Sequence, residues 1–206
     1  MPKYVKRYAD WKRKIWFEIV APQQIFNEAP LGETPAYEAS QVIGRRVEWN
    51  LALLTGNFRF QNAKVIFRIV RVQGTKAYTE LEAYELYEAY IRRIVRRGTD
   101  RIDDSFVVKT RDGIEVRVKP LVITAYNTTR SRRKAIRKKF REIIENVAKE
   151  LDYYDFMRKI LFQELQNEAR PILHKIYPVD RVEIRKAIRV TPFKEVLEIL
   201  GIAAKT

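Results

Sequence analysis

A strand pattern late in the chain limits the folds that this sequence can adopt. From Arg181 to Val190, apolar and charged residues alternate. One face carries Val182, Ile184, Ile188 and Val190 together with Lys186, and the other carries Arg181, Glu183, Arg185 and Arg189. A half-buried strand needs a sheet to join, and the other strand patterns lie before Ala125. The sequence therefore predicts one α+β domain in which a helical insertion at about 130–177 precedes the last strand.

The earlier strand signals define the rest of this sheet. Short β-branched, aromatic or alternating segments predict strands at 15–20, 47–53, 64–72 and 77–85. Asp112-Gly113 between alternating segments predicts a hairpin that joins 101–110 to 114–125. Pro120 in the second arm predicts a bulge or an edge position. The prolines and glycine of 27–40 predict irregular chain there.

Helical signals begin near Leu86, where the apolar period changes from two to 3.6. The pattern predicts a helix that ends at Gly98, with Arg92, Arg93, Arg96 and Arg97 on one side of its last turn. Cations at that end complement the helix dipole, so a phosphate contact and a structural role are equally supported. Shorter helices are expected at 153–165 and 166–176, with Pro171 kinking or beginning the second.

The basic stretch 126–151 dominates the insertion. Ile136, Phe140, Ile143, Val147 and Leu151 form a continuous apolar stripe, so the segment is a helix docked on a core. The first half carries eight cations and no carboxylate: Arg130, Arg132, Arg133, Lys134, Arg137, Lys138, Lys139 and Arg141. Arg133, Arg137 and Arg141 lie four residues apart, where like charges repel. We expect a polyanion to neutralise them; the alternative is a solvated face kept for solubility.

The overall charge also indicates a nucleic-acid partner. The formal net charge is +15 and the pI is about 10.0. A basic N-terminal arm over 1–14 interleaves aromatic residues with Lys3, Lys6, Arg7, Lys12, Arg13 and Lys14. Such an arm can lie along RNA with its rings available to bases, although packing of Tyr8 and Trp11 on the core fits equally well.

Signals for catalysis are weak. The chain has no cysteine, and its one histidine, His174, fits a structural role in a helix better than a catalytic one. Asp103 and Asp104 point to opposite faces of a strand, and no glycine-rich phosphate loop is present. We therefore expect no catalytic residue, metal or cofactor. No signal peptide or membrane span is expected, and the cysteine content suits a cytoplasmic protein.

Four motifs in sequence order resemble those of a known family. They are GRRVEWNLALL at 44–54, DGIEVRVKPLVIT at 112–124, TTRSRRKAIRKKFREI at 128–143, and IYPVDRVEIRKAIRVTPFK at 176–194. Together they resemble the archaeal and eukaryotic small-subunit ribosomal protein family three-A-e, also called eukaryotic-type S-one, in its shorter archaeal form.

This resemblance implies a fold and a role. It implies a mixed, mostly antiparallel, barrel-like sheet flanked by helices, in a ribosomal protein of the small-subunit platform near the messenger exit. Its partners would be ribosomal RNA, neighbouring platform proteins and messenger RNA near the exit, with no reaction and no cofactor. A free chromatin or messenger-RNA binder is the alternative, and an RNA-modifying enzyme is less favoured.

The expected organisation is a basic arm at 1–14, one RNA-binding α+β domain at 15–200 and a tail at 201–206. We expect the cations of the arm, of the 92–97 cluster and of the basic helix to contact RNA phosphates. Such contacts position a protein on RNA, and RNA shape supplies specificity.

Overall fold

The computed structural model describes residues 14–191 of the chain, which contain nine strands and six α-helices. They divide into two compact units. Unit 1 comprises the residues up to Glu48 and Phe67–Leu81, and unit 2 comprises Trp49–Ile66 and the residues from Glu82 onward. Strands β4 (Ala63–Gln73) and β5 (Lys76–Leu86) run through both, so the single domain expected at 15–200 stays a prediction. Residues 1–13 and 192–206, which include most of the expected arm and the whole expected tail, lie outside the described residues.

Unit 1 is built on the predicted strand β1 (Ile15–Val20). It pairs antiparallel with β2 (Pro30–Ala36) and parallel with the start of β5. Beside this sheet, Phe26 of α1 (Gln23–Phe26) packs edge-on against Phe67, with ring centroids 5.7 Å apart. The prediction of irregular chain over 27–40 is wrong for the residues that form β2. Because β2 is an edge strand, its prolines interrupt no ladder on its outer side.

The strand predicted for 47–53 is correct only as far as Asn50. β3 (Arg46–Asn50) pairs with β4, and the Asn50 side chain then accepts a hydrogen bond from the Ala52 N–H at 2.8 Å. This N-cap starts α2 (Leu51–Thr55), so Leu51 is buried while Leu53 is 72% exposed. A 3-10 turn, η3 (Phe58–Phe60), follows with Asn57 as its cap.

The sheet of unit 2 confirms the predicted late strand. β9 (Val179–Arg189) lies antiparallel between β5 and β8 (Glu115–Thr124). The other side of β8 pairs with β6 (Arg101–Asp103) and β7 (Phe106–Lys109). The predicted hairpin turn joins β7 to β8, and the Thr110 N–H donates to the Ile114 carbonyl at 3.0 Å. A register shift at Lys119/Pro120 confirms the expected bulge. The fold class is thus α+β with a mostly antiparallel, open sheet.

The face assignment predicted for β9 is wrong. Glu183 and Arg189 are buried, whereas Val190 lies beyond the strand and is 39% exposed. The register with β8 skips Arg185, so Ala187 and Arg189 lie on the same face as Val182 and Ile184, and the predicted alternation fails beyond that point. Tyr90 covers Glu183, and the Arg189 guanidinium lies 5.2 Å from the ring centroid of Tyr153.

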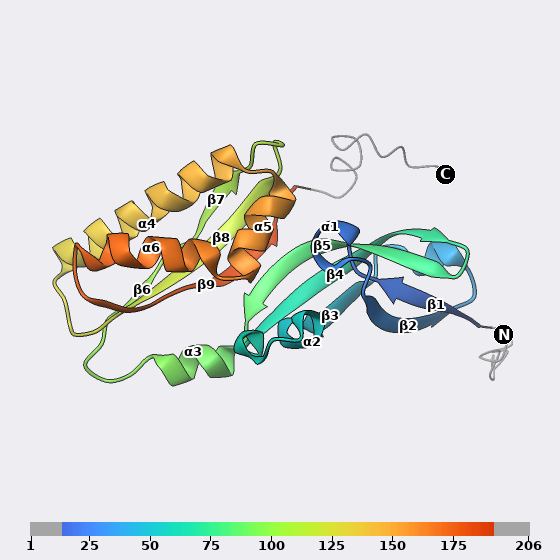
Figure 1. The fold of residues 1–206 in the computed structure, drawn as a ribbon, viewed down its shortest axis with the longest axis horizontal. Coiled ribbons are helices and arrows are strands. Elements are labelled where there is room, and N and C mark those ends of the chain that lie inside the picture. The colour runs from blue at the N-terminus through green and yellow to red at the C-terminus, as the bar shows by residue number, and fades with distance from the viewer. Residues whose placement is uncertain (1–13, 192–206) are drawn as a thin grey trace, which may run out of the picture. The chain divides into compact units, whose positions relative to one another are not determined.

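Three helices form the predicted insertion and pack on one face of the unit 2 sheet (Figure 1). They are α4 (Arg130–Glu150), α5 (Tyr153–Leu161) and α6 (Glu164–His174). The break between the last two falls at Gln163, which has a left-handed φ of 61°, and Pro171 lies inside α6 rather than at its start. The buried stripe of α4 is Ile136, Phe140, Ile144 and Ala148. Ile143 and Val147, predicted at its centre, are half-buried beside it.

The stripe of α4 can be tested by two neighbouring substitutions. Ile144→Ala should lower the free energy of unfolding by about 2–4 kcal/mol, because it leaves a cavity under the helix. Ile143→Ala should cost about 1 kcal/mol, since that side chain is only half-buried. Urea unfolding followed by circular dichroism measures both values. Equal losses would contradict the observed stripe.

Candidate nucleic-acid interface

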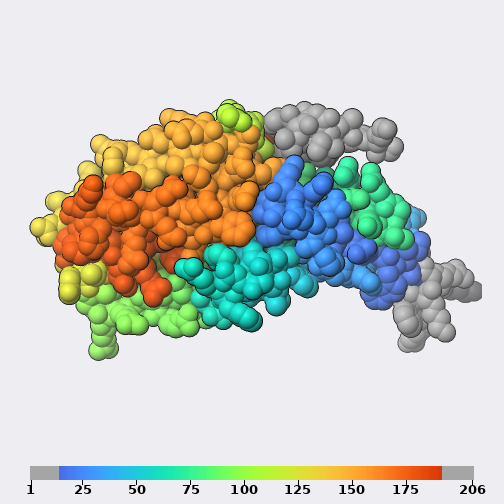
Figure 2. Space-filling model, viewed as in Figure 1, coloured from blue at the N-terminus to red at the C-terminus, as the bar shows by residue number. Residues whose placement is uncertain are grey.

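The outer face of α4 presents cations without acidic partners. Figure 2 shows this helix on the surface of unit 2, coloured amber. Arg130, Lys134 and Lys138 are exposed, stand at i, i+4 and i+8, and make no ion pair within the described chain. Arg132 is also exposed and lies over the Tyr177 ring, with 5.2 Å from guanidinium to centroid. We call these four residues the free basic face.

The row formed by Arg133, Arg137 and Arg141 faces the chain's own segment 100–104. Arg133 lies 3.9 Å from an Asp100 carboxylate oxygen, and Arg137 donates to the Asp103 carbonyl at 3.2 Å. Arg141 donates from Nη2 to both oxygens of Asp104, at 2.9 and 2.8 Å. The predicted repulsion within this row is therefore offset internally. Contacts of this row with RNA stay a prediction.

Asp100 also fixes the start of α4. Its carboxylate accepts from the Thr128 N–H at 2.7 Å, and its own N–H donates to the Thr124 hydroxyl at 2.9 Å. One aspartate thus connects the end of β8 to the chain that enters the helix. Lys139 has a partner too, because it pairs with Glu142 at 3.2 Å. Among the α4 cations predicted to contact RNA, the four of the free basic face are therefore the ones available to an external anion.

The predicted 92–97 cluster is divided by the end of a helix. α3 (Glu88–Ile94) stops four residues before Gly98, so Arg96 and Arg97 follow the helix and the predicted last turn is wrong. Val95 leaves the helix in an extended conformation, which a β-branched residue favours. Arg92 pairs with Glu88 at 3.4 Å, whereas Arg93 donates to the Asn62 side chain at 3.4 Å and lies over the Tyr90 ring.

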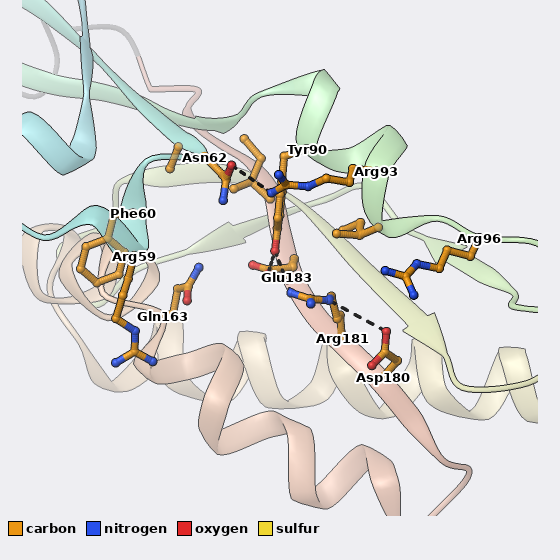
Figure 3. A pocket seen from close by; sticks show the side chains of 13 residues that line it. Arg59, Phe60, Asn62, Tyr90, Arg93, Arg96, Gln163, Asp180, Arg181 and Glu183 are labelled. Atoms are coloured by element: carbon orange, nitrogen blue, oxygen red, sulfur yellow. Dashed lines mark hydrogen bonds and ion pairs between the residues drawn. The ribbon is translucent and has the colours of Figure 1, made fainter.

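A pocket of about 530 Å³ lies within unit 2 between η3, α3 and β9 (Figure 3). Four exposed arginines line it, and we call it the arginine pocket: Arg59, Arg93, Arg96 and Arg181. Its deeper lining comprises Ala63, Leu86, Tyr90, Ile94 and Glu183, all buried. Sequence reasoning found Arg93 and Arg96 but missed the others. In the sequence, a buried carboxylate was indicated only by Glu183, which lies between the apolar residues Val182 and Ile184.

A hydrogen-bonded chain connects the rim of this pocket to its floor. Arg181 donates to the Tyr90 hydroxyl at 3.2 Å, and that hydroxyl donates to Oε1 of Glu183 at 3.0 Å. Oε2 of Glu183 is buried and has no hydrogen-bond partner within the described chain. Burial raises the pKa of Glu183, while the Tyr90 hydrogen bond and the Arg181 charge oppose that rise. Burial and the nearby Glu183 charge also raise the pKa of Tyr84 and of Tyr90.

Of the predicted arm, only Lys14 lies in the described residues, where its ammonium is 5.4 Å from the Tyr37 ring centroid. His174 accepts the Val179 N–H through Nδ1 at 3.2 Å, which matches the predicted structural role. Within residues 14–191, no group of three acidic, histidine or cysteine side chains could hold a metal ion. No helix in that range is long and apolar enough to cross a membrane.

Comparison with known proteins supplies an independent observation. Residues 3–192 match the family model described as the ribosomal S3Ae family. The chain is 51% identical over 175 residues to the small ribosomal subunit protein eS1 of Nanoarchaeum equitans, a match that covers 85% of this chain and 88% of the relative. It is 42% identical over 176 residues to the protein of the same name from Saccharolobus islandicus strain L.S.2.15, with 85% and 84% covered. The small ribosomal subunit protein eS1 of Saccharolobus solfataricus is 40% identical over 176 residues, and that match covers 85% of this chain and 84% of the relative.

The buried Glu183 carboxylate predicts a pH-dependent stability. Because its pKa is raised on folding, the folded protein holds the proton more tightly, and stability is lost as the pH rises from the ordinary value of 4.5 through the raised one. Glu183→Gln removes this loss, so the variant should gain stability relative to wild type at pH 7 compared with pH 4. Urea unfolding at both pH values measures the difference.

Tyr90→Phe serves as the matched second variant. It removes the hydrogen bond that lowers the pKa of Glu183, so the loss of stability with rising pH should become larger than in wild type. An effect of Glu183→Gln that is identical at pH 4 and pH 7 would contradict this account.

Proposed function

The chain belongs to the ribosomal S3Ae family, and we propose on that basis that it is a structural protein of the small ribosomal subunit that binds ribosomal RNA. The observation that supports the RNA contact is the free basic face of α4. Its cations stand on a helix anchored from behind by Ile136 and Phe140, so they are presented on a firm surface.

The spacing of this face suits a phosphate backbone. Arg130, Lys134 and Lys138 follow one another over about 12 Å of helix. Like charges at these positions repel by a few tenths of a kcal/mol per pair when nothing neutralises them. The neighbouring row is neutralised by the chain itself through Asp100 and Asp104, but this one is not. An external polyanion would remove the repulsion and release counterions.

The basic N-terminal arm and the 92–97 cluster would supply further phosphate contacts. Contacts of this kind hold a protein in register, while the shape of the folded RNA provides specificity. We place the protein on the platform of the cytoplasmic small subunit, near the messenger exit and beside other platform proteins, as the family resemblance implies. The role requires no catalysis and no cofactor.

Salt dependence tests the phosphate contacts. Binding of the full chain to small-subunit ribosomal RNA should weaken with salt, with a log–log slope of magnitude roughly 4–7 if about six to eight phosphates are engaged. Changing Arg130, Lys134 and Lys138 together to Ala should lower that magnitude by about 2–3 and weaken binding on the order of tenfold or more at physiological salt.

The matched control changes three exposed cations of α5, α6 and the following turn: Arg158, Arg170 and Lys175. It removes the same net charge and should leave the slope nearly unchanged. A wild-type slope near one, or equal losses in the two triple variants, would count against the free basic face.

Sedimentation tests the ribosomal role. In a sucrose gradient of cell extract, the wild type should travel with the small subunit, followed by immunoblot. The triple change of Arg130, Lys134 and Lys138 to Glu should shift the protein toward the top, because reversed charges repel the phosphates. The control triple to Glu should stay with the subunit. Wild-type protein at the top of the gradient would instead indicate a free nucleic-acid-binding protein.

A further inference from the structure

The arginine pocket combines a largely apolar floor with a rim of cations, an arrangement that suits a nucleotide. Its floor is apolar and closed, formed by Ala63, Leu86 and Ile94, all less than a tenth exposed. Glu183 lies on β9 with 7% exposure, and its Oε2 lacks a hydrogen bond within the described chain. The exposed guanidinium groups surround this floor (Figure 3). A ligand that fits both layers is anionic outside and carries hydrogen-bond donors inside.

Other ligand classes fit these layers less well. An acidic peptide would suit the arginines but would bring carboxylates toward Glu183. A cationic ligand would suit Glu183 but would meet four arginines on entry. A nucleotide separates its charge from its donors, with phosphate at one end and base N–H groups at the other. The volume of about 530 Å³ lies in the range of roughly 300–1,000 Å³ typical of small-ligand sites.

The state of Glu183 selects among the four bases. Tyr90 already donates to Oε1, which retains one lone pair. Oε2 retains both lone pairs but is closed off from solvent in this structure, so the carboxylate has to turn toward the pocket to meet a base with both oxygens. Guanine offers two adjacent donors, N1–H and N2–H, that match two carboxylate oxygens. Adenine and cytosine place an acceptor nitrogen beside their amino group, and uracil flanks its N3–H with two carbonyls. Each of these three would set an acceptor against the carboxylate.

The aromatic lining adds a stacking surface. Phe60 of η3 is half-buried, and its ring is held by an edge contact with Phe162 at 5.8 Å between centroids. Stacking of an unstacked base on an aromatic ring is a common element of single-stranded RNA recognition. We propose that the arginine pocket holds one guanine nucleotide unstacked from RNA, with its Watson–Crick edge on Glu183, its base beside Phe60 and its phosphate among the rim arginines.

This inference rests on the proposed function in one respect, that the RNA is ribosomal. Two further arginines next to the pocket favour RNA over a free nucleotide. Arg92 and Arg97 are exposed and adjoin the pocket residues Arg93 and Arg96, so phosphates on either side of the bound guanosine would also meet cations.

Kethoxal probing tests the base contact, because this reagent reacts with N1 and N2 of guanine. Small subunits from cells that carry wild-type chain, Glu183→Gln or the control Glu115→Gln would be compared. Glu115 is an exposed carboxylate of β8 that does not line the pocket. One guanine that is protected in wild type and control should gain reactivity by about five- to tenfold in Glu183→Gln, since the amide NH₂ opposes the base donors. Immunoblotting confirms equal incorporation.

Binding by the free full-length chain separates this proposal from the ribosomal role. GMP and AMP would be titrated by NMR into wild type, Arg93→Ala/Arg96→Ala and the control Arg158→Ala/Arg170→Ala, which changes two exposed arginines that do not line the pocket. Wild type and control should prefer GMP, and Arg93→Ala/Arg96→Ala should lose most of that binding. The chain's absence from small subunits would sink the proposed function but leave this titration to judge the pocket.

Three outcomes would overturn the inference. The first is a titration with no preference for GMP over AMP together with kethoxal reactivity that is the same in all three subunits. The second is GMP binding without any change in guanine reactivity in subunits that contain the chain, which would assign the pocket to a free nucleotide. The third is an equal gain of reactivity in the Glu115→Gln control, which would remove the role of Glu183.

Discussion

The insertion of β9 between β5 and β8 is the constraint on which unit 2 depends. The strand pairs on both edges. On the β5 side, Lys186 of β9 donates a hydrogen bond to Glu85 of β5, which lies 101 positions earlier in the chain. Because α6 also packs on β9, six of the eleven residues of the strand are buried. Glu183 is covered by Tyr90 of α3, and the hydrogen-bonded chain through Tyr90 to Arg181 offsets part of the cost of burying its charge. The fold thus places one carboxylate in the otherwise largely apolar floor of the arginine pocket.

The cations of α4 form two rows that differ in their partners. One row is satisfied by the chain's own acceptors in 100–104, which orient the helix on the sheet. The other row has no such acceptors within the described chain and faces outward. Partly buried pairs such as Arg141 with Asp104, whose side chain is 14% exposed, are screened less by salt than exposed ones. High salt should therefore weaken contacts of the outer row with an anion while the helix keeps its place.

Periodicity was sufficient for much of this fold. Alternation identified β4 and the late strand, Asp112-Gly113 located the hairpin, and the stripe on α4 was displaced by one residue. The errors arose where a local signal competed with tertiary pairing. Proline and glycine in β2 resemble a loop unless β1 is known to pair beside them, and Asn50 ends a strand by capping a helix. Sequence also cannot separate α4 cations with internal partners from free ones, because Asp100 and Asp104 come from a distant element. The pocket was hidden because η3, α3 and β9 meet only in the folded chain.

The order of strands along the chain also imposes an order on folding. Until β9 is available, β5 and the facing edge of β8 carry backbone N–H and C=O groups with no strand between them. Closing that gap requires the chain to return across the whole helical insertion, and such non-local pairing is slow. During synthesis, α4 emerges before β9 can complete the sheet beneath its neighbour α6. Until β9 pairs, the apolar side of α6 has no strand to pack on, so the nascent chain keeps an exposed apolar surface that closure of the sheet removes.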